Sequence, residues 1–139
     1  MLFTVTEKQA IESARKIKLL LLDVDGILTD GRLYFSNSGE EIVSKRASDL
    51  GIEILYQGRE DKIDVLQEIS AKQGYTLDSI CYAGDDLPDL PVLNAVGLSF
   101  SVPGAHESVQ EAVHGITTRG GGAGAVREIT DFILSSKAL

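Results

Sequence analysis

The stretch that decides the fold is LLLLDVDG, residues 19–26. It closes an apolar run, Ile17–Leu22, that ends at acids and a glycine, which is typical of a strand buried on both faces of a parallel sheet. In α/β proteins with such sheets, ligands bind at the carboxyl ends of the strands. The stretch therefore predicts a parallel α/β sheet, with Asp23 and Asp25 at the edge where ligands bind.

Outside this stretch, short apolar runs alternate with segments of helical periodicity. Further strands are expected at 52–56, 80–83, 97–102 and 116–118. Helices are expected at 6–16, 45–50, 61–73, 90–96, 105–113 and 125–134. Two β-prone pieces around a turn-forming cluster predict a β-hairpin, the flap, at about 32–43. The alternation predicts an α/β fold with a doubly wound, mostly parallel sheet, in a single domain that spans 1–139.

The composition is that of a globular protein, with 43% hydrophobic and 24% charged residues. No stretch approaches the roughly 20 apolar residues that cross a membrane. The first residues lack the apolar core of an export signal, so we expect a cytoplasmic protein with no membrane partner. A net charge of −8 argues against a nucleic-acid partner, because phosphate backbones are bound by basic patches. The single cysteine, Cys81, lies in an apolar run, which predicts a buried thiol; His106 and His114 are isolated and receive no role.

Two acidic clusters follow apolar strands: Asp23 with Asp25, and Asp85 with Asp86 and Asp89. Carboxylates at neighbouring strand ends repel one another, and a Mg²⁺ ion held by oxygen ligands relieves the repulsion. An ionised aspartate can also attack phosphorus, and a carboxylate two residues on can protonate the leaving oxygen. The alternative is that each cluster only ends its strand, since acids and glycines are common in turns. The coincidence of two clusters favours a catalytic metal site.

Two motifs carry a family resemblance. The sequences DVDGILTDG at residues 23–31 and GDDLPD at residues 84–89 resemble the first and fourth motifs of the haloacid dehalogenase phosphatases. The flap, the segment 56–62 and the tail 119–128 are similar to the capless 3-deoxy-D-manno-octulosonate 8-phosphate phosphatases of that superfamily. The resemblance covers nearly the whole chain. It implies a haloacid dehalogenase-like Rossmannoid fold without a cap domain.

The same resemblance assigns roles to individual residues. It implies Asp23 as the nucleophile, Asp25 as the general acid and base, and Mg²⁺ bound by Asp23, Asp85 and the backbone carbonyl of Asp25. Lys62, in the first turn of the helix expected at 61–73, would neutralise the phosphoryl group and be oriented by Asp89. Without the acidic clusters, a solvated surface lysine would be the simpler interpretation of Lys62.

Further implied roles concern the periphery of the site. Asp86 would support the surroundings of the metal, and Arg119 or Arg127 would reach a carboxylate or phosphate of the substrate from the glycine-rich tail. Arg127 is equally compatible with an exposed helix position. Members of this family form tetramers in which neighbouring subunits complete each site, so the resemblance also implies a homotetramer.

One part of the family pattern is missing from this sequence. A strand that ends in a serine or threonine, which would hydrogen-bond the phosphoryl group, is expected between the flap and Ile52, and the sequence offers none. Ser44 and Ser48 are the available hydroxyls, but neither follows an apolar strand. The gap has three explanations: an internal segment lost from this sequence alone, a deletion that impairs catalysis, or a rebuilt sheet that still works. We favour the first, because the acids and Lys62 are intact.

These observations together predict a phosphatase. The expected reaction is Mg²⁺-dependent hydrolysis of a phosphorylated 3-deoxy sugar acid, 3-deoxy-D-manno-octulosonate 8-phosphate by resemblance, through an aspartyl-phosphate at Asp23. Two alternatives stay open: a phosphatase of the same fold that acts on a nine-carbon sugar acid, and a catalytically impaired homologue that binds metal or phosphate.

Overall fold

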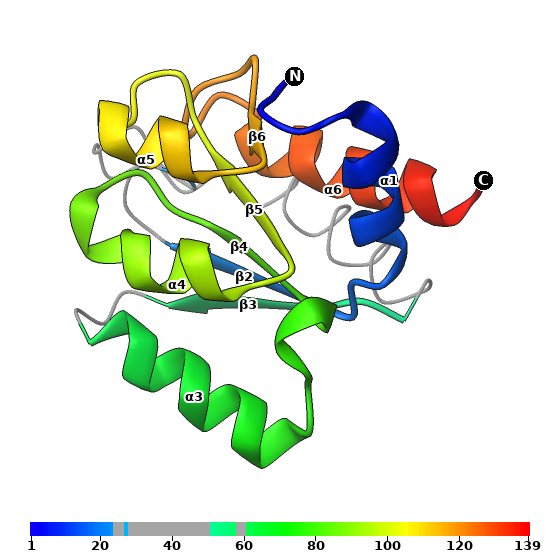
Figure 1. The fold of residues 1–139 in the computed structure, drawn as a ribbon, viewed down its shortest axis with the longest axis vertical. Coiled ribbons are helices and arrows are strands. Elements are labelled where there is room, and N and C mark those ends of the chain that lie inside the picture. The colour runs from blue at the N-terminus through cyan, green and yellow to red at the C-terminus, as the bar shows by residue number, and fades with distance from the viewer. Residues whose placement is uncertain (24–26, 28–50, 58–60) are drawn as a thin grey trace.

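A computed structural model describes residues 1–23, 27, 51–57 and 61–139 of the chain (Figure 1). The described residues form one six-stranded sheet in the order β1-β6-β5-β4-β2-β3. Its strands are β1 (Leu2–Phe3), β2 (Leu19–Asp23), β3 (Glu53–Gln57), β4 (Ile80–Ala83), β5 (Leu98–Ser101) and β6 (Gly115–Ile116). Strand β1 is antiparallel to β6, and all the other pairs are parallel. The predicted mostly parallel α/β sheet is therefore confirmed.

Helices cover both faces of this sheet (Figure 1). They are α1 (Glu7–Arg15), α3 (Lys62–Gln73), α4 (Leu90–Ala95), α5 (Glu107–Ala112) and α6 (Ala125–Lys137), with short 3₁₀ turns at Leu77–Ser79 and Leu87–Asp89. Helices α1 and α6 lie on one face, and α3, α4 and α5 lie on the other. In the part of the chain that is described, no helix is long and apolar enough to cross a membrane.

Strand β2 is the centre of both core layers, because all five of its residues are buried. Leu20 and Leu22 pack in the cluster that includes residues of α1 and α6, whereas Leu19 and Leu21 pack in the cluster that includes residues of α3, α4 and α5. Successive side chains of a strand point to opposite faces, so a run of four leucines serves two cores at once. This arrangement confirms the strand buried on both faces that the run predicts, and the helices on both faces confirm the doubly wound architecture that the alternation of strands and helices predicts.

Sequence and structure differ at the two edges of the sheet. Strand β1 was not expected, since two residues are too short to show a periodicity; it pairs Leu2 with Ile116 of β6. Its Phe3 ring packs against Phe132 of α6, with the ring centroids 5.1 Å apart.

The bounds of two other expected elements also differ. The strand expected at 116–118 is Gly115–Ile116, and the helix expected at 125–134 continues to Lys137. The predicted flap at 32–43 and the helix at 45–50 lie outside the described residues.

At the other edge, β3 is the direct neighbour of β2. The two strands run parallel over five residue pairs, from Leu19 beside Glu53 to Asp23 beside Gln57. Among the described residues, no strand lies between them, so the sheet is continuous across the position where the family resemblance implies another strand. The carboxyl end of β3 therefore lies next to Asp23, and α3 begins shortly after it in the chain.

The two-sided core predicts a large effect from truncating a leucine of β2. Leu20→Ala should lower the free energy of unfolding by about 2–5 kcal/mol, because Leu20 is fully buried and the substitution leaves a cavity. Urea unfolding followed by circular dichroism measures the change. The matched control is Leu77→Ala, since Leu77 is 42% exposed and should lose much less stability. Equal losses in the two variants would contradict the described core.

Candidate active site

The candidate site lies at the carboxyl ends of β2 and β4, where acidic residues gather. Asp23 is the last residue of β2 and is 5% exposed. Lys62 is the first residue of α3, and its Nζ donates a hydrogen bond to Asp23 Oδ2 at 3.0 Å. The parallel β2–β3 pair places the start of α3 beside the end of β2. Asp23 and Lys62, which are 39 positions apart in the sequence, thus form an ion pair.

Asp89 is the most enclosed group of the site, with no exposed surface. Its Oδ1 accepts hydrogen bonds from Lys62 Nζ and from the Tyr82 hydroxyl, both at 2.6 Å. Its Oδ2 accepts from the backbone N–H groups of Asp85 at 3.0 Å and Asp86 at 3.1 Å. Both oxygens of a buried carboxylate are therefore satisfied, as burial of an ionised group requires. Asp89 thus contacts Lys62, the lysine that the family resemblance implies it orients.

The sequence did not single out three residues that shape this centre. Tyr82 of β4 supplies a hydroxyl to Asp89 from inside an apolar strand. Gly84 passes so close to Asp89 that a Cβ atom there would lie 2.4 Å from Asp89 Cγ. The Ser101 hydroxyl of β5 donates to the Gly84 carbonyl at 2.7 Å. A tyrosine in an apolar strand and a glycine before two acids were visible signals, but their partner is identified only by the fold.

Three carboxylates converge at this edge. Oxygen atoms of Asp23, Asp85 and Asp89 lie within 4.8 Å of one another. Burial, followed by the charges of Asp23, Asp89 and Asp86, raises the pKa of Asp85 to about 6, although Lys62 acts in the opposite direction. The charge of the three acids thus exceeds that of the one lysine among them. Hard oxygen ligands with uncompensated negative charge fit a divalent cation such as Mg²⁺.

Lys62 is charged in this setting. Burial lowers its pKa, but the hydrogen bonds and the charges of Asp89 and Asp23 outweigh that effect, so the pKa is raised overall. The Nζ atom lies between the two carboxylates and forms ion pairs with both, at 3.0 and 2.6 Å. A fixed positive charge beside Asp23 is suited to an anionic group bound there.

The other predicted residues lie away from the carboxylate group or outside the described residues. Asp25, Ser44 and Ser48 lie outside the described residues. Asp86 is exposed, and its Oδ1 accepts from the backbone N–H of Leu87 at 2.8 Å, so it caps the 3₁₀ turn. The predicted burial of Cys81 is confirmed, and burial raises the pKa of its thiol well above the usual range.

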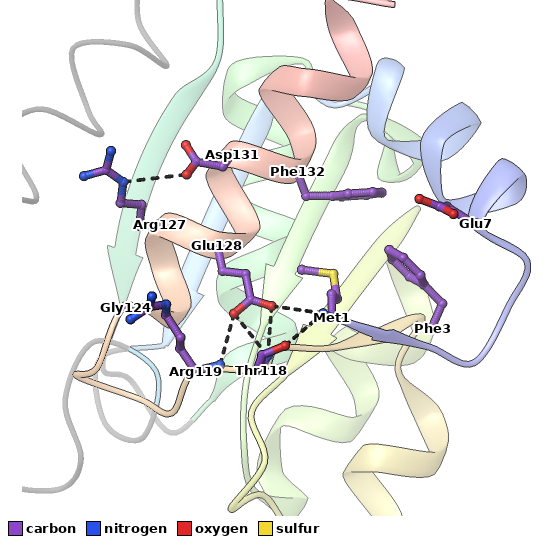
Figure 2. A pocket seen from close by; sticks show the side chains of 10 residues that line it. All are labelled: Met1, Phe3, Glu7, Thr118, Arg119, Gly124, Arg127, Glu128, Asp131 and Phe132. Carbon is purple, nitrogen blue, oxygen red and sulfur yellow. Dashed lines mark hydrogen bonds and ion pairs between the residues drawn. The ribbon is translucent and has the colours of Figure 1, made fainter.

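Arg119 and Arg127 line a different hollow, between the N-terminal strand and α6 (Figure 2). This pocket of about 830 Å³ is also lined by Phe3, Phe132 and Glu128, and by neither Asp23 nor Lys62. The Arg127 side chain is 59% exposed and pairs with Asp131 at 3.6 Å on the same helix. The structure therefore does not bring either arginine into the carboxylate centre.

Comparisons with known proteins agree with this geometry. The family model of haloacid dehalogenase-like hydrolases matches residues 4–129. The 3-deoxy-D-manno-octulosonate 8-phosphate phosphatase KdsC of Yersinia pestis is 36% identical, over 89% of this chain and 83% of that protein. The same-named protein of Escherichia coli K12 is 35% identical, over 89% and 82%.

Solved structures of similar proteins share the fold. The 3-deoxy-D-manno-octulosonate 8-phosphate phosphatase of Moraxella catarrhalis, in complex with magnesium, phosphate and 3-deoxy-D-manno-octulosonate (KDO), superposes with a TM-score of 0.88. It is 29% identical, and the match covers 96% of this chain and 94% of that chain. The cobalt-bound deoxy-D-mannose-octulosonate 8-phosphate phosphatase of Haemophilus influenzae has a TM-score of 0.82 at 28% identity, over 91% and 92%.

The alignment with the Yersinia protein also measures the internal gap. It extends over 155 residues, whereas 89% of the 139 residues of this chain is about 124. About 31 aligned positions of the relative therefore have no counterpart here. A strand with its crossover helix, which the family resemblance implies before Ile52, has about this length.

The raised pKa of Asp85 predicts a pH-dependent stability. A carboxyl whose folded pKa is about 6 binds more protons in the folded than in the unfolded protein between about pH 4 and 6, so stability falls as the pH rises through this range. In EDTA, Asp85→Asn should therefore be more stable than the wild type at pH 7.5, and the difference should shrink at pH 4.5. Urea unfolding at the two pH values measures this.

The matched control for that prediction is Asp78→Asn, which removes an exposed acid away from the carboxylate group. Its effect on stability should be small at both pH values. A loss of stability in Asp85→Asn at pH 7.5 in EDTA would contradict the repulsion described above.

Proposed function

We propose that this chain, which belongs to the haloacid dehalogenase-like hydrolase family, is a Mg²⁺-dependent phosphomonoesterase. The proposed substrate is 3-deoxy-D-manno-octulosonate 8-phosphate, the compound named in the relatives from Yersinia pestis and Escherichia coli. The observation that carries the proposal is the convergence of Asp23, Lys62 and Asp85 at the carboxyl ends of β2 and β4.

Asp23 is the proposed nucleophile. Its carboxylate attacks phosphorus, the bond to the leaving alkoxide breaks, and water later cleaves the aspartyl-phosphate to release inorganic phosphate. The ion pair with Lys62 favours the ionised carboxylate, which is the reactive form. Asp25, two residues on in the sequence, is the proposed acid that protonates the leaving oxygen and the base that activates the water.

Asp23 and Asp85 are the proposed metal ligands, together with the backbone carbonyl of Asp25. Asp89 also lies within this carboxylate group, but its two oxygens already accept four hydrogen bonds, which favours a role in holding Lys62 over a role as a ligand. When bound, Mg²⁺ supplies positive charge that balances the acids and the phosphoryl oxygens.

A second candidate function follows from the internal gap of about 31 positions. The family resemblance implies a strand with a phosphate-binding hydroxyl before Ile52, and the sequence offers none, so a chain that binds metal and phosphate with impaired turnover is the alternative. A nine-carbon sugar acid phosphate is the alternative substrate. We further propose a cytoplasmic location and a homotetramer. The family resemblance implies the homotetramer, and size-exclusion chromatography coupled to light scattering tests it.

Phosphate release tests the activity directly. With Mg²⁺ and the octulosonate phosphate, the purified chain should release inorganic phosphate, and EDTA should abolish the release until Mg²⁺ is restored. Asp23→Asn should lower kcat at least about a thousandfold, because the nucleophile is lost. Asp78→Asn is the control and should keep wild-type activity, since Asp78 is exposed.

The outcomes of the phosphate-release assay test the nucleophile assignment, the binding-only alternative and the choice of substrate. Release that survives Asp23→Asn would refute the nucleophile assignment. No release by the wild type, combined with measurable Mg²⁺ binding in calorimetry, would favour the binding-only alternative. A nine-carbon sugar acid phosphate, assayed in parallel, identifies the preferred substrate by its higher kcat/KM.

The two lysines of α3 offer a matched pair. Lys62→Met should lower kcat by about 10²–10³-fold, because it removes a fixed positive charge beside Asp23. Lys72→Met removes an exposed lysine near the end of the same helix and should change kcat less than about twofold. Steady-state kinetics measures both. Similar effects of the two substitutions on kcat would contradict a catalytic role of Lys62.

A further inference from the structure

Glu128, in the first turn of α6, binds two consecutive backbone amides of another segment (Figure 2). Its Oε2 accepts from the N–H of Thr118 at 2.8 Å, and its Oε1 accepts from the N–H of Arg119 at 3.0 Å. The amino group of Met1 lies 3.6 Å from Oε2 as well. The carboxylate therefore fixes the point at which the chain leaves β6.

The segment that begins there is the glycine loop, defined as residues 119–124. Three contacts shape it besides those of Glu128. The Thr117 hydroxyl donates to the Arg119 carbonyl at 2.6 Å, and the N–H of Ala123 donates to the Gly120 carbonyl at 3.0 Å. Gly122 has a φ of 74°, which favours glycine, and its N–H donates to the carbonyl of Ile27 at 3.2 Å.

Ile27 connects the loop to the candidate active site. It follows Asp23 by four positions in the sequence and is fully buried. Its side chain belongs to the core cluster that contains Leu20 and Leu22 of β2. The side chain is thus held by the core and the carbonyl by Gly122, while Asp23 is held at the end of β2. Asp23 and Ile27, four positions apart in the sequence, are thus each held by contacts of their own.

We infer that Glu128 is a positioning residue for the nucleophile Asp23. It holds the start of the glycine loop, the loop presents the N–H of Gly122 to the carbonyl of Ile27, and Ile27 lies four positions after the nucleophile Asp23. This role rests on the proposed function of Asp23. It predicts that Glu128 affects the rate of the chemical step more than substrate affinity, because small displacements of reacting groups lower rates steeply.

The test compares three variants by steady-state kinetics and by thermal unfolding. Glu128→Ala removes both acceptor oxygens and should lower kcat by about tenfold or more, with KM changed less than about threefold. Glu128→Gln keeps one acceptor oxygen and should recover a substantial part of the rate. Ile133→Val is the control. It removes one methyl group from the buried side of α6 and should lower Tm while leaving kcat unchanged.

Hydrogen exchange at the amide of Gly122, measured by NMR, gives a readout that does not depend on activity. Glu128→Ala should accelerate this exchange, whereas Ile133→Val should change it only as much as it changes core amides. Unchanged exchange at Gly122 in Glu128→Ala would overturn the inference. Unchanged kcat, or an equal loss of kcat in Ile133→Val, would overturn it too.

The two proposals can fail separately. If the wild-type chain releases no phosphate, the proposed function fails, and faster exchange at Gly122 in Glu128→Ala would still support the contact between the loop and Ile27. If the wild-type chain is active and Glu128→Ala is as fast, only the positioning role of Glu128 fails.

Discussion

The burial of one carboxylate, that of Asp89, is the constraint on which the site depends. Taking an ionised carboxylate out of water is costly unless donors replace the water, and here a lysine, a tyrosine hydroxyl and two backbone amides do so. The requirement works in both directions. It keeps Lys62 at the end of β2, and it folds residues 84–89 around the carboxylate, which is why position 84 has no room for a Cβ atom.

Asp85 is the contrasting case within the same loop. Asp89 has its donors, whereas Asp85 faces the charges of Asp23, Asp89 and Asp86 with partial relief from Lys62, and its pKa is raised to about 6. The loop therefore contains one carboxylate whose charge is balanced and one whose charge is not. Their difference explains how a single cluster can hold a lysine firmly and still attract a cation.

The sequence predicted most of what is local. Four leucines followed by acids predict a central strand with a functional end, and helical spacing predicts where Lys62 begins α3. Contacts between distant segments were beyond its reach: the Tyr82 hydroxyl on Asp89 and the Glu128 carboxylate on the amide of Arg119 depend on which elements pack together. Strand β1 was missed for a different reason, since two residues carry no measurable pattern.

The internal gap affects the catalytic rate that is expected of this site. Lys62 lies 3.0 Å from Asp23 with β3 adjoining β2 directly, so this ion pair does not require a strand between β2 and β3. The sequence of β3, EILYQ, contains no serine or threonine, the two residue types that the family resemblance implies at the end of such a strand. Losing one donor to a transferring group costs about 10²–10³ in rate, far less than losing the nucleophile. On this reasoning, we expect the proposed phosphatase activity to be slowed rather than abolished, because Asp23 and Asp85 still converge where the nucleophile and the metal ligands are proposed.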